Sequence, residues 1–308
     1  RDRSIRKWSR DGRLVDTLRE GHAFLIVGIR PFRDGTRFAT SAVDGSVRIW
    51  NVVDRREVAV FEGLGRSGLS AIAPDDRTIA VADGSKLRLV PVDGNGDSSA
   101  ASEITAAGWG NLLVASFSPD GARLAVGDDR GQVIVIELNY GSLDGARSSL
   151  LQRHNDRITA LEWIDERTLV SGSDDRIAVR WRETDGNWSD TPLAHGDSVV
   201  ALAGRADGSL LSVTRGGTLR LWSSQSDQPL ATFEISASQD GTESSGGKPR
   251  VTAMTLDGAG NAIVAEEGGG RLVRFRIDGA SIEALTDESS EVSAATIGRF
   301  ETATIAML

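Results

Sequence analysis

A pattern of short strand-like runs recurs along the whole chain and restricts the fold more than any other feature. Each run alternates apolar and polar residues with the period of two that is typical of a β-strand. Each also ends in a large apolar residue, and successive end points lie 42, 40, 46, 45, 41 and 53 residues apart. A repeat of this length predicts an array or ring of similar units. The end points are Trp8, Trp50, Val90, Ile136, Trp181, Trp222 and Phe275.

Three further strand-like runs accompany these end points. In the second repeat they cover residues 24–29, 37–42 and 57–61, and a turn at residues 31–35 separates the first two. Asp-Gly and Pro-Asp pairs in such turns favour tight backbone reversals. No window shows a convincing helical period. The sequence therefore predicts an all-β chain built from units of four short antiparallel strands.

The two ends of the chain together supply one of these units. Residues 291–308 provide its first two strands and residues 1–20 its last two. When the ends are joined without a gap, Asp2 aligns with Asp175 and Trp8 with Trp181. A closed ring that shares one unit between its termini removes exposed sheet edges. We therefore predict a first unit from residues 1–20 and 289–308, followed by units at residues 21–62, 63–107, 108–152, 153–194, 195–236 and 237–288.

The repeats resemble those of WD-repeat β-propellers, in which a Gly-His precedes the first strand and a Trp ends the third. Residues 21–51 and 154–181 match this pattern well, whereas the repeats that end at Val90, Ile136 and Phe275 keep only the period and the strand pattern. The resemblance implies a single domain over residues 1–308, a seven-bladed β-propeller closed by a blade shared between the termini. Among the 35 basic residues only three are lysines, a bias typical of GC-rich bacterial genomes, so we expect a bacterial, divergent member.

All three histidines stand at the repeat position that precedes the first strand of a unit. In the family this His is hydrogen-bonded with a Ser or Thr, a turn Asp and the Trp. A Ser-His-Asp nucleophile is the alternative, but it would need one exposed hydroxyl with an oxyanion hole rather than three near-copies. The resemblance thus implies structural sets, the third of which has Gly216 in place of Asp. They are His22, Thr40, Asp44 and Trp50; His154, Ser171, Asp175 and Trp181; and His195, Ser212 and Trp222.

Charge and composition exclude several functions. The 44 acidic residues outnumber the 35 basic ones and give a net charge of −9, which disfavours general binding to nucleic acid or to an anionic membrane. No apolar run approaches the ~18 residues of a membrane span. The absence of Cys excludes disulfides, thiol nucleophiles and Cys-bearing zinc sites. We expect no cofactor, no metal and a monomeric propeller. Because no signal peptide is recognised, we also expect a cytoplasmic location.

Three motif-like segments are interpreted as loops. Residues 63–68 fit G-x-G-x-x-G, but a strand follows where a dinucleotide site needs a helix. Residues 93–97 resemble the start of a calcium loop, yet Ser98 and Ile104 replace the Gly and Glu that such a loop requires, which leaves weak cation binding as the alternative. Residues 236–249 are rich in Ser and Gly and predict a mobile insertion.

No convergent catalytic set is visible, and the first strands of the units are interpreted as Ala, Val, Ile, Leu and Thr. The sequence therefore predicts a non-catalytic protein–protein interaction platform that holds a partner protein or domain. One alternative is a sensor or regulatory module of a larger bacterial signalling protein, such as an NTPase, a kinase or a caspase-like protease. Another is a propeller enzyme with a site in the axial channel, which clustered Asp, Glu, His or Tyr side chains on the first strands, facing the axis, would support.

The resemblance also implies where a partner binds. Family members use the face that carries the loops between units and the turns between the second and third strands. The residues carried over to that face mix Arg and Asp with a small apolar sector, which suits a protein partner. They are Leu25, Val27, Val43, Arg66, Asp83, Asn111, Asp129, Arg157, Thr159, Asp174, Ser198, Val200, Arg215 and Arg250.

Overall fold

The computed structural model contains only β-strands as regular secondary structure in the residues that it describes. The all-β prediction is therefore confirmed, and none of these residues belongs to a helix long and apolar enough to cross a membrane. The described residues are 5–8, 14–18, 21–64, 69–92, 101–235, 250–257, 259–267, 272–285, 296–299 and 304–307.

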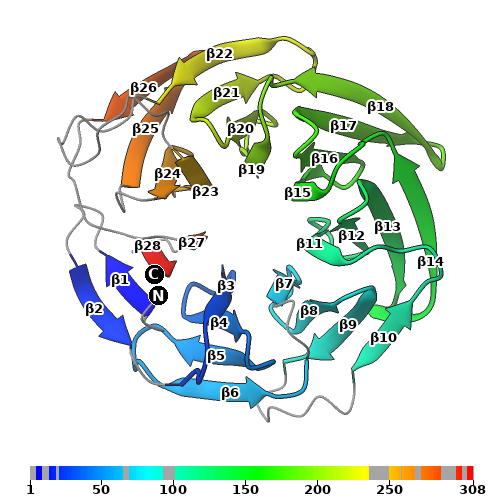
Figure 1. The fold of residues 1–308 in the computed structure, drawn as a ribbon, viewed down its shortest axis with the longest axis vertical. Coiled ribbons are helices and arrows are strands. Elements are labelled where there is room, and N and C mark those ends of the chain that lie inside the picture. The colour runs from blue at the N-terminus through cyan, green and yellow to red at the C-terminus, as the bar shows by residue number, and fades with distance from the viewer. Residues whose placement is uncertain are drawn as a thin grey trace.

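The strands form four-stranded antiparallel sheets that are arranged around a common centre (Figure 1). In six sheets the strands follow one another in chain order, from the centre to the rim. The first three of these contain β3 (Ile26–Pro31), β4 (Arg37–Ala42), β5 (Val47–Asn51) and β6 (Glu57–Phe61); β7 (Leu69–Ile72), β8 (Thr78–Asp83), β9 (Lys86–Pro91) and β10 (Ser102–Thr105); and β11 (Leu112–Phe117), β12 (Arg123–Asp128), β13 (Gln132–Asn139) and β14 (Ser142–Gln152).

The next three sheets repeat the same order. Within them the second and third strands are the most deeply buried, and all six residues of β16 are buried. They contain β15 (Ile158–Asp165), β16 (Thr168–Ser173), β17 (Ile177–Thr184) and β18 (Asn187–Ala194); β19 (Val199–Gly204), β20 (Leu210–Thr214), β21 (Thr218–Trp222) and β22 (Pro229–Glu234); and β23 (Arg250–Leu256), β24 (Ala262–Glu267), β25 (Leu272–Asp278) and β26 (Ser281–Leu285).

The remaining sheet combines the two ends of the chain. Its order is β2 (Leu14–Leu18), β1 (Ile5–Trp8), β28 (Thr304–Met307) and β27 (Thr296–Arg299). Within it β1 and β28 are antiparallel, with Arg6 opposite Ala306. The marked ends of the chain accordingly lie side by side in Figure 1.

The hydrophobic core lies between neighbouring sheets rather than in one central mass. One cluster joins Ile49 and Phe61 of the β3–β6 sheet to Ile79 and Val81 of the next sheet. These four side chains are at most 1% exposed. Because fully burying such a side chain contributes about 1.5–3 kcal/mol, each sheet is stabilised mainly by its two neighbours.

The outer strands are where the sequence prediction is incomplete. A fourth strand is predicted for every unit, but the sequence pattern does not place the residues of β18 and β26. Strand β14 spans 11 residues, of which the pattern indicates only residues 148–152. Most residues of β18 are exposed, so the strand lacks the apolar alternation that reveals the inner strands. The end of the G-x-G-x-x-G segment, residues 93–97 and residues 236–249 lie outside the described residues.

Candidate interaction face and its supporting side chains

His22 joins a loop, a strand and a turn of one sheet. Its Nε2 lies 2.7 Å from Thr40 Oγ1, and the same oxygen accepts a hydrogen bond of 2.8 Å from the Trp50 indole. On the other side its Nδ1 lies 3.4 Å from Asp44 Oδ2, which also accepts from the backbone N–H of Ala23 at 3.1 Å. The loop before β3 is thereby fixed to the turn between β4 and β5.

His154 makes the corresponding contacts, with a shorter distance to the turn Asp. Its Nε2 lies 2.7 Å from Ser171 Oγ, which accepts a bond of 2.8 Å from the Trp181 indole. Its Nδ1 lies 2.9 Å from Asp175 Oδ2. The structure thus brings together all four residues of this set, as it does for His22.

His195 lacks the carboxylate and uses a backbone acceptor instead. Its Nε2 lies 2.7 Å from Ser212 Oγ, which accepts a bond of 2.8 Å from Trp222. Its Nδ1 lies 2.8 Å from the carbonyl oxygen of Leu193. The loop before β19 and the turn between β20 and β21 are still linked, but here the loop provides the carboxylate. Asp197 Oδ2 in that loop accepts from the Gly216 N–H in the turn at 2.7 Å. Sequence reasoning missed this exchange of the acidic residue between the two loops.

The three imidazoles are held in the neutral form. Burial lowers the pKa of His22 and of His154, and the carboxylates of Asp44 and Asp175 offset only part of this effect. Burial lowers the pKa of His195 further, to about 4. In a neutral imidazole Nδ1–H donates to its acceptor, so Nε2 accepts from the Ser or Thr hydroxyl, which in turn accepts from the indole.

This bonding argues against a nucleophilic role for the hydroxyls. Thr40, Ser171 and Ser212 are fully buried at 0% exposure. Each oxygen already contacts both an indole and an imidazole, so no substrate carbonyl can approach it. The geometry therefore supports a structural role for the three sets.

The predicted interaction residues come together through a hydrogen bond that recurs from sheet to sheet. In each of these sheets, the residue just before the turn between the second and third strands donates its backbone N–H. The acceptor is a carbonyl in the loop before the first strand, three residues after the repeat position of the His. The pairs are Val43 with Leu25 at 2.9 Å, Asp129 with Asn111 at 3.0 Å, Asp174 with Arg157 at 3.2 Å and Arg215 with Ser198 at 2.8 Å. The two loop positions of each of these sheets thus form one edge of the same face.

Two arginines share one carboxylate on this face. Arg157 Nε contacts Asp174 Oδ2 at 2.5 Å, and Arg215 contacts Asp174 Oδ1 from the next sheet at 3.0 Å. The side chains of Arg157 and Arg215 are 49% and 35% exposed, against 12% for Asp174. The group therefore keeps one excess positive charge at the surface.

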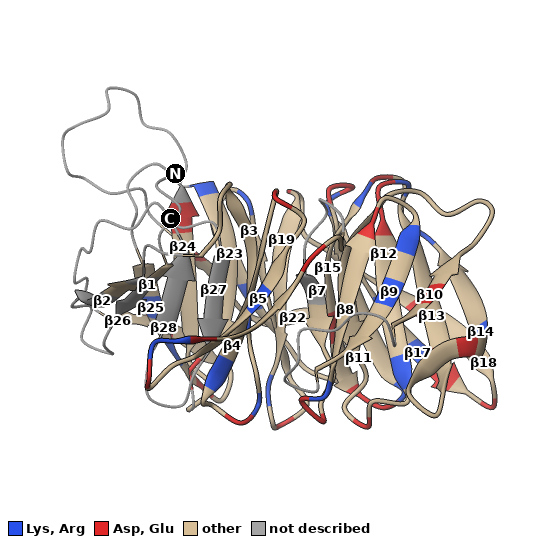
Figure 2. Cartoon of the chain, turned by 90° about the horizontal axis from the view of Figure 1, so that it is seen from below, with Lys and Arg blue, Asp and Glu red and all other residues tan. Residues whose placement is uncertain are grey.

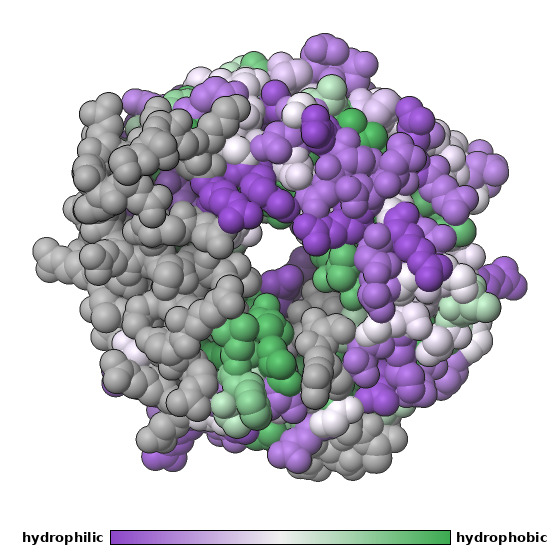
Figure 3. All heavy atoms as spheres, in the orientation of Figure 1, coloured by the Kyte–Doolittle hydropathy of each residue, from purple (hydrophilic) through white to green (hydrophobic). Residues whose placement is uncertain are grey.

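An apolar sector lies beside the mouth of the central opening. Val27 is 37% exposed and the unpredicted Phe24 is 60% exposed, while Leu113 of β11, two sheets further along, is 47% exposed. Figure 3 shows apolar surface here over β3 and β4, with polar surface across the opening. In the edge-on view of Figure 2 the charged residues gather at the turns on both faces of the ring.

The other predicted face residues take different places. Asp83 is exposed at the end of β8, and Arg250 is exposed at the start of β23. The Thr159 hydroxyl donates to the carbonyl oxygen of Val199, so it is engaged within the ring. Val200 lines the central opening. Arg66 lies outside the described residues.

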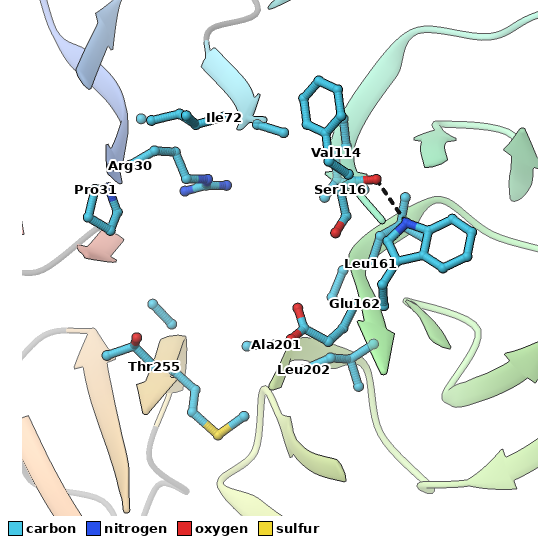
Figure 4. Close-up of a pocket in the computed structure, with 18 of the residues that line it drawn as sticks. Arg30, Pro31, Ile72, Val114, Ser116, Leu161, Glu162, Ala201, Leu202 and Thr255 are labelled. Atoms are coloured by element: carbon cyan, nitrogen blue, oxygen red, sulfur yellow. Dashed lines mark hydrogen bonds between the residues drawn. The ribbon is translucent and has the colours of Figure 1, made fainter. Parts of the chain in front are cut away.

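The first strands surround a central channel of about 670 Å³ (Figure 4). Arg30 of β3 and Glu162 of β15 line it, so the interpretation of these strands as only Ala, Val, Ile, Leu and Thr is wrong. Burial raises the pKa of Glu162 to about 7, although the Gly204 N–H donates to its carboxylate at 2.9 Å and opposes the rise.

The described residues contain no group of three or more His, Asp or Glu side chains that could hold a metal ion.

Comparison with known proteins identifies the repeat. Residues 12–51, which run from before β2 to the end of β5, match the family model described as "WD domain, G-beta repeat". The chain is similar to WD40 repeat proteins. Two solved structures share the fold at a TM-score of 0.77. The "Structure of U3-55K" has 14% identity over 99% of this chain and 98% of its own, and the "Crystal structure of RRP9 WD40 repeats" has 15% over 98% and 97%.

Curated relatives match the chain at low identity and are longer. SIR4-interacting protein SIF2 of Saccharomyces cerevisiae (strain ATCC 204508 / S288c) is 24% identical over 228 residues, 74% of this chain and 36% of that protein. Apoptotic protease-activating factor 1 of Mus musculus is 24% identical over 222 residues, 71% of this chain and 17% of that protein. The chain thus spans about a third or less of the length of these relatives. Both come from eukaryotes, so the expected bacterial origin stays a prediction.

Proposed function

We propose that this chain is a non-catalytic protein–protein interaction platform: a seven-bladed propeller, closed by the blade that its termini share, which binds a partner protein on its loop face. The observation that carries the proposal is the exposed apolar sector of Phe24 and Val27 on the face that also carries the Arg157–Asp174–Arg215 group. Protein interfaces combine an apolar centre with Arg-rich polar surroundings.

The closed ring is part of this proposal because a platform must be rigid. The pairing of β1 with β28 and the contacts of β27 with β3 and β23 support it. A closed ring, in which every sheet packs between two others, keeps its loops in fixed positions, which lowers the entropy lost when a partner binds. The blade boundaries expected from the sequence, a monomeric state and a cytoplasmic location belong to the same proposal.

Charge reversal of the arginines tests the binding face. The double variant Arg157→Glu/Arg215→Glu places three acidic groups together, so we expect it to abolish capture of the partner from an extract of the source cell. The matched control is Arg167→Glu, in the same sheet but in the turn between β15 and β16, on the opposite face. Circular dichroism and thermal unfolding establish that both variants fold. Retained capture by the folded double variant would move the binding site to another face.

A regulatory module of a larger polypeptide is the second candidate. The specific support is the coverage of the relatives, since the match includes only 17% of Apoptotic protease-activating factor 1 of Mus musculus. A propeller within such a chain would bind another domain of the same polypeptide rather than a separate protein. An immunoblot with an antibody raised against residues 101–235 gives the mass of the protein in the source cell. A band near 32.7 kDa would contradict this second candidate.

A further inference from the structure

Four polar side chains lie at one level of the central channel. Each of these residues pairs with a residue of the second strand of its sheet. That second-strand residue directly follows the one that pairs with the large apolar residue ending the third strand. This shared register places them at equivalent heights around the channel, and Figure 4 shows all four beside the open space. They are Arg30 of β3, Ser116 of β11, Glu162 of β15 and Thr255 of β23.

The two charged members do not neutralise each other. On one side of the channel the β7 and β11 strands separate β3 from β15, and on the other side β19, β23 and β27 do so. No ion pair joins Arg30 to Glu162, and Arg30 donates within the described residues only to the carbonyl oxygen of its neighbour Ile29, at 2.9 Å. Glu162 accepts there only from Gly204. Each charge thus faces the channel without a counter-charge among the described residues.

The channel is polar at this level and apolar around it. Ile72, Val114 and Leu161 line the same space, and the hydroxyls of Ser116 and Thr255 make no hydrogen bond with another described residue. Charged groups in such surroundings favour partners of opposite charge, because the low dielectric strengthens their attraction. The volume of about 670 Å³ falls in the range of small-molecule sites.

We propose that the channel binds a small dipolar molecule that carries one carboxylate and one ammonium group. Its carboxylate pairs with the Arg30 guanidinium, which offers a planar pair of donors. Its ammonium group pairs with the Glu162 carboxylate on the other side of the channel. The Ser116 and Thr255 hydroxyls contact the molecule between its two ends. This site is separate from the loop face proposed above, and neither proposal depends on the other.

A series of ω-amino acids tests the proposal directly. Glycine, β-alanine, 4-aminobutyrate, 5-aminopentanoate and 6-aminohexanoate separate the same two groups by increasing lengths, and isothermal titration calorimetry on the full chain at pH 8 measures each affinity. We expect one length to bind best, with a Kd of about 1 mM or tighter. Acetate and butylamine, which carry one charge each, should bind at least about tenfold more weakly. Absence of saturable binding by the whole series would overturn the proposal.

Variants assign the two ends of the molecule. Arg30→Met and Glu162→Gln keep the approximate side-chain volume and remove one charge each, so each should weaken binding at least about tenfold. Arg182→Met, on β17 and outside the channel, is the matched control and should bind as the unmodified chain does. Thermal unfolding shows whether each variant folds. Equal affinity in all folded variants would show that binding occurs elsewhere and would contradict the assignment.

The pH dependence provides an independent readout. The ammonium group needs an ionised Glu162, whose pKa burial raises to about 7, so affinity should fall about tenfold between pH 8 and pH 6. The other charged side chains that line the channel in the described residues are Arg30, Arg33 and Asp76. Glu162→Gln should remove this dependence. An affinity that is the same at pH 8 and pH 6 in the unmodified chain would contradict pairing with Glu162.

Discussion

Thr40, Ser171 and Ser212 each stand at the centre of a hydrogen-bonded chain from an indole to an imidazole. Each hydroxyl accepts from a Trp and donates to a His, and both partners lie within 2.8 Å. Because every donor in the chain has an acceptor, removing one member leaves buried polar groups unpaired, which is costly.

Asp175→Ala tests the stabilising role of one set. The substitution leaves His154 Nδ1 and the Asn155 N–H without their acceptor, so we expect the free energy of unfolding to fall by about 1–3 kcal/mol. Urea denaturation measures the change. The control is Asp190→Ala, which removes an exposed ion pair with Arg153 and should change stability by less than about 1 kcal/mol. Equal effects of the two substitutions would contradict the assignment.

His195 should make folding sensitive to acid. Its pKa is lowered to about 4 in the folded chain, against about 6.5 when unfolded. The unfolded state therefore binds a proton first, so the stability contribution is present above pH 6.5 and is lost as the pH falls toward 4. Between pH 7 and pH 5 the unmodified chain should lose about 2 kcal/mol more stability than His195→Gln. Denaturation at both pH values measures this, and parallel losses would contradict a neutral buried His195.

The sequence could predict the histidine positions because all three recur at one repeat position. It could not predict that the Leu193 carbonyl and Asp197 would replace the missing turn Asp, since a backbone acceptor leaves no residue signature. Arg30 and Glu162 were missed for another reason. A charged residue on an inner strand breaks the apolar composition but not the alternation, and only the ring shows that the position faces an open channel.

At the scale of elements, the second strands must allow the neighbouring sheet to approach closely. Gly127 of β12 and Gly172 of β16 occupy the same repeat position, opposite Val133 and Ala178 of their third strands. A Cβ at Gly172 would lie 2.7 Å from Val199 Cγ1 of the next sheet. These glycines therefore serve the packing between sheets, not a turn.

Gly172→Ala tests this close approach. Overpacking should lower the free energy of unfolding by about 1–3 kcal/mol. In a Val199→Ala background the added methyl group finds space, so the cost of Gly172→Ala should become smaller. Denaturation of the unmodified chain, both single variants and the double variant gives the coupling energy. The same cost in both backgrounds would contradict contact between the two sites.

The second and third strands could be predicted because they are buried on both sides, and because each third strand ends in a large apolar residue. A fourth strand was expected in every sheet, but the residues of β18 and β26 could not be placed, because their mostly exposed side chains leave no periodic pattern. Hydrogen bonds to the third strand and a few packed side chains, such as Leu193 and Ile282, keep them in the sheet.

At the scale of the whole molecule, the pairing of β1 with β28 decides whether the ring is closed. The core adds one contact across this region, since Ile5 is 3% exposed and packs with Ile26 and Trp50 of the β3–β6 sheet. The sequence match between the joined termini and residues 169–181 predicted such a pairing. The register of β1 with β28 supports this pairing.

An engineered disulfide tests closure in a chain that has no cysteine of its own. Arg6 and Ala306 are directly opposite in the β1–β28 ladder, where Cα atoms lie about 4.5–5.5 Å apart and a disulfide can form. We expect Arg6→Cys/Ala306→Cys to oxidise and to stabilise the chain by about 2–4 kcal/mol. Arg6→Cys/Arg299→Cys is the control, since these positions are not opposite. Failure of the first pair to oxidise would contradict closure.

The central claim, that one face of the ring binds a partner protein, is tested most directly by hydrogen exchange with and without the captured partner. The proposed face predicts that protection increases at residues 21–25, 155–157, 174–176, 197–198 and 215–217. The turns between the first and second strands, at residues 33–36, 119–122, 165–167 and 205–208, should exchange at unchanged rates. Protection at these turns, with unchanged exchange in the loops of the proposed face, would contradict the account.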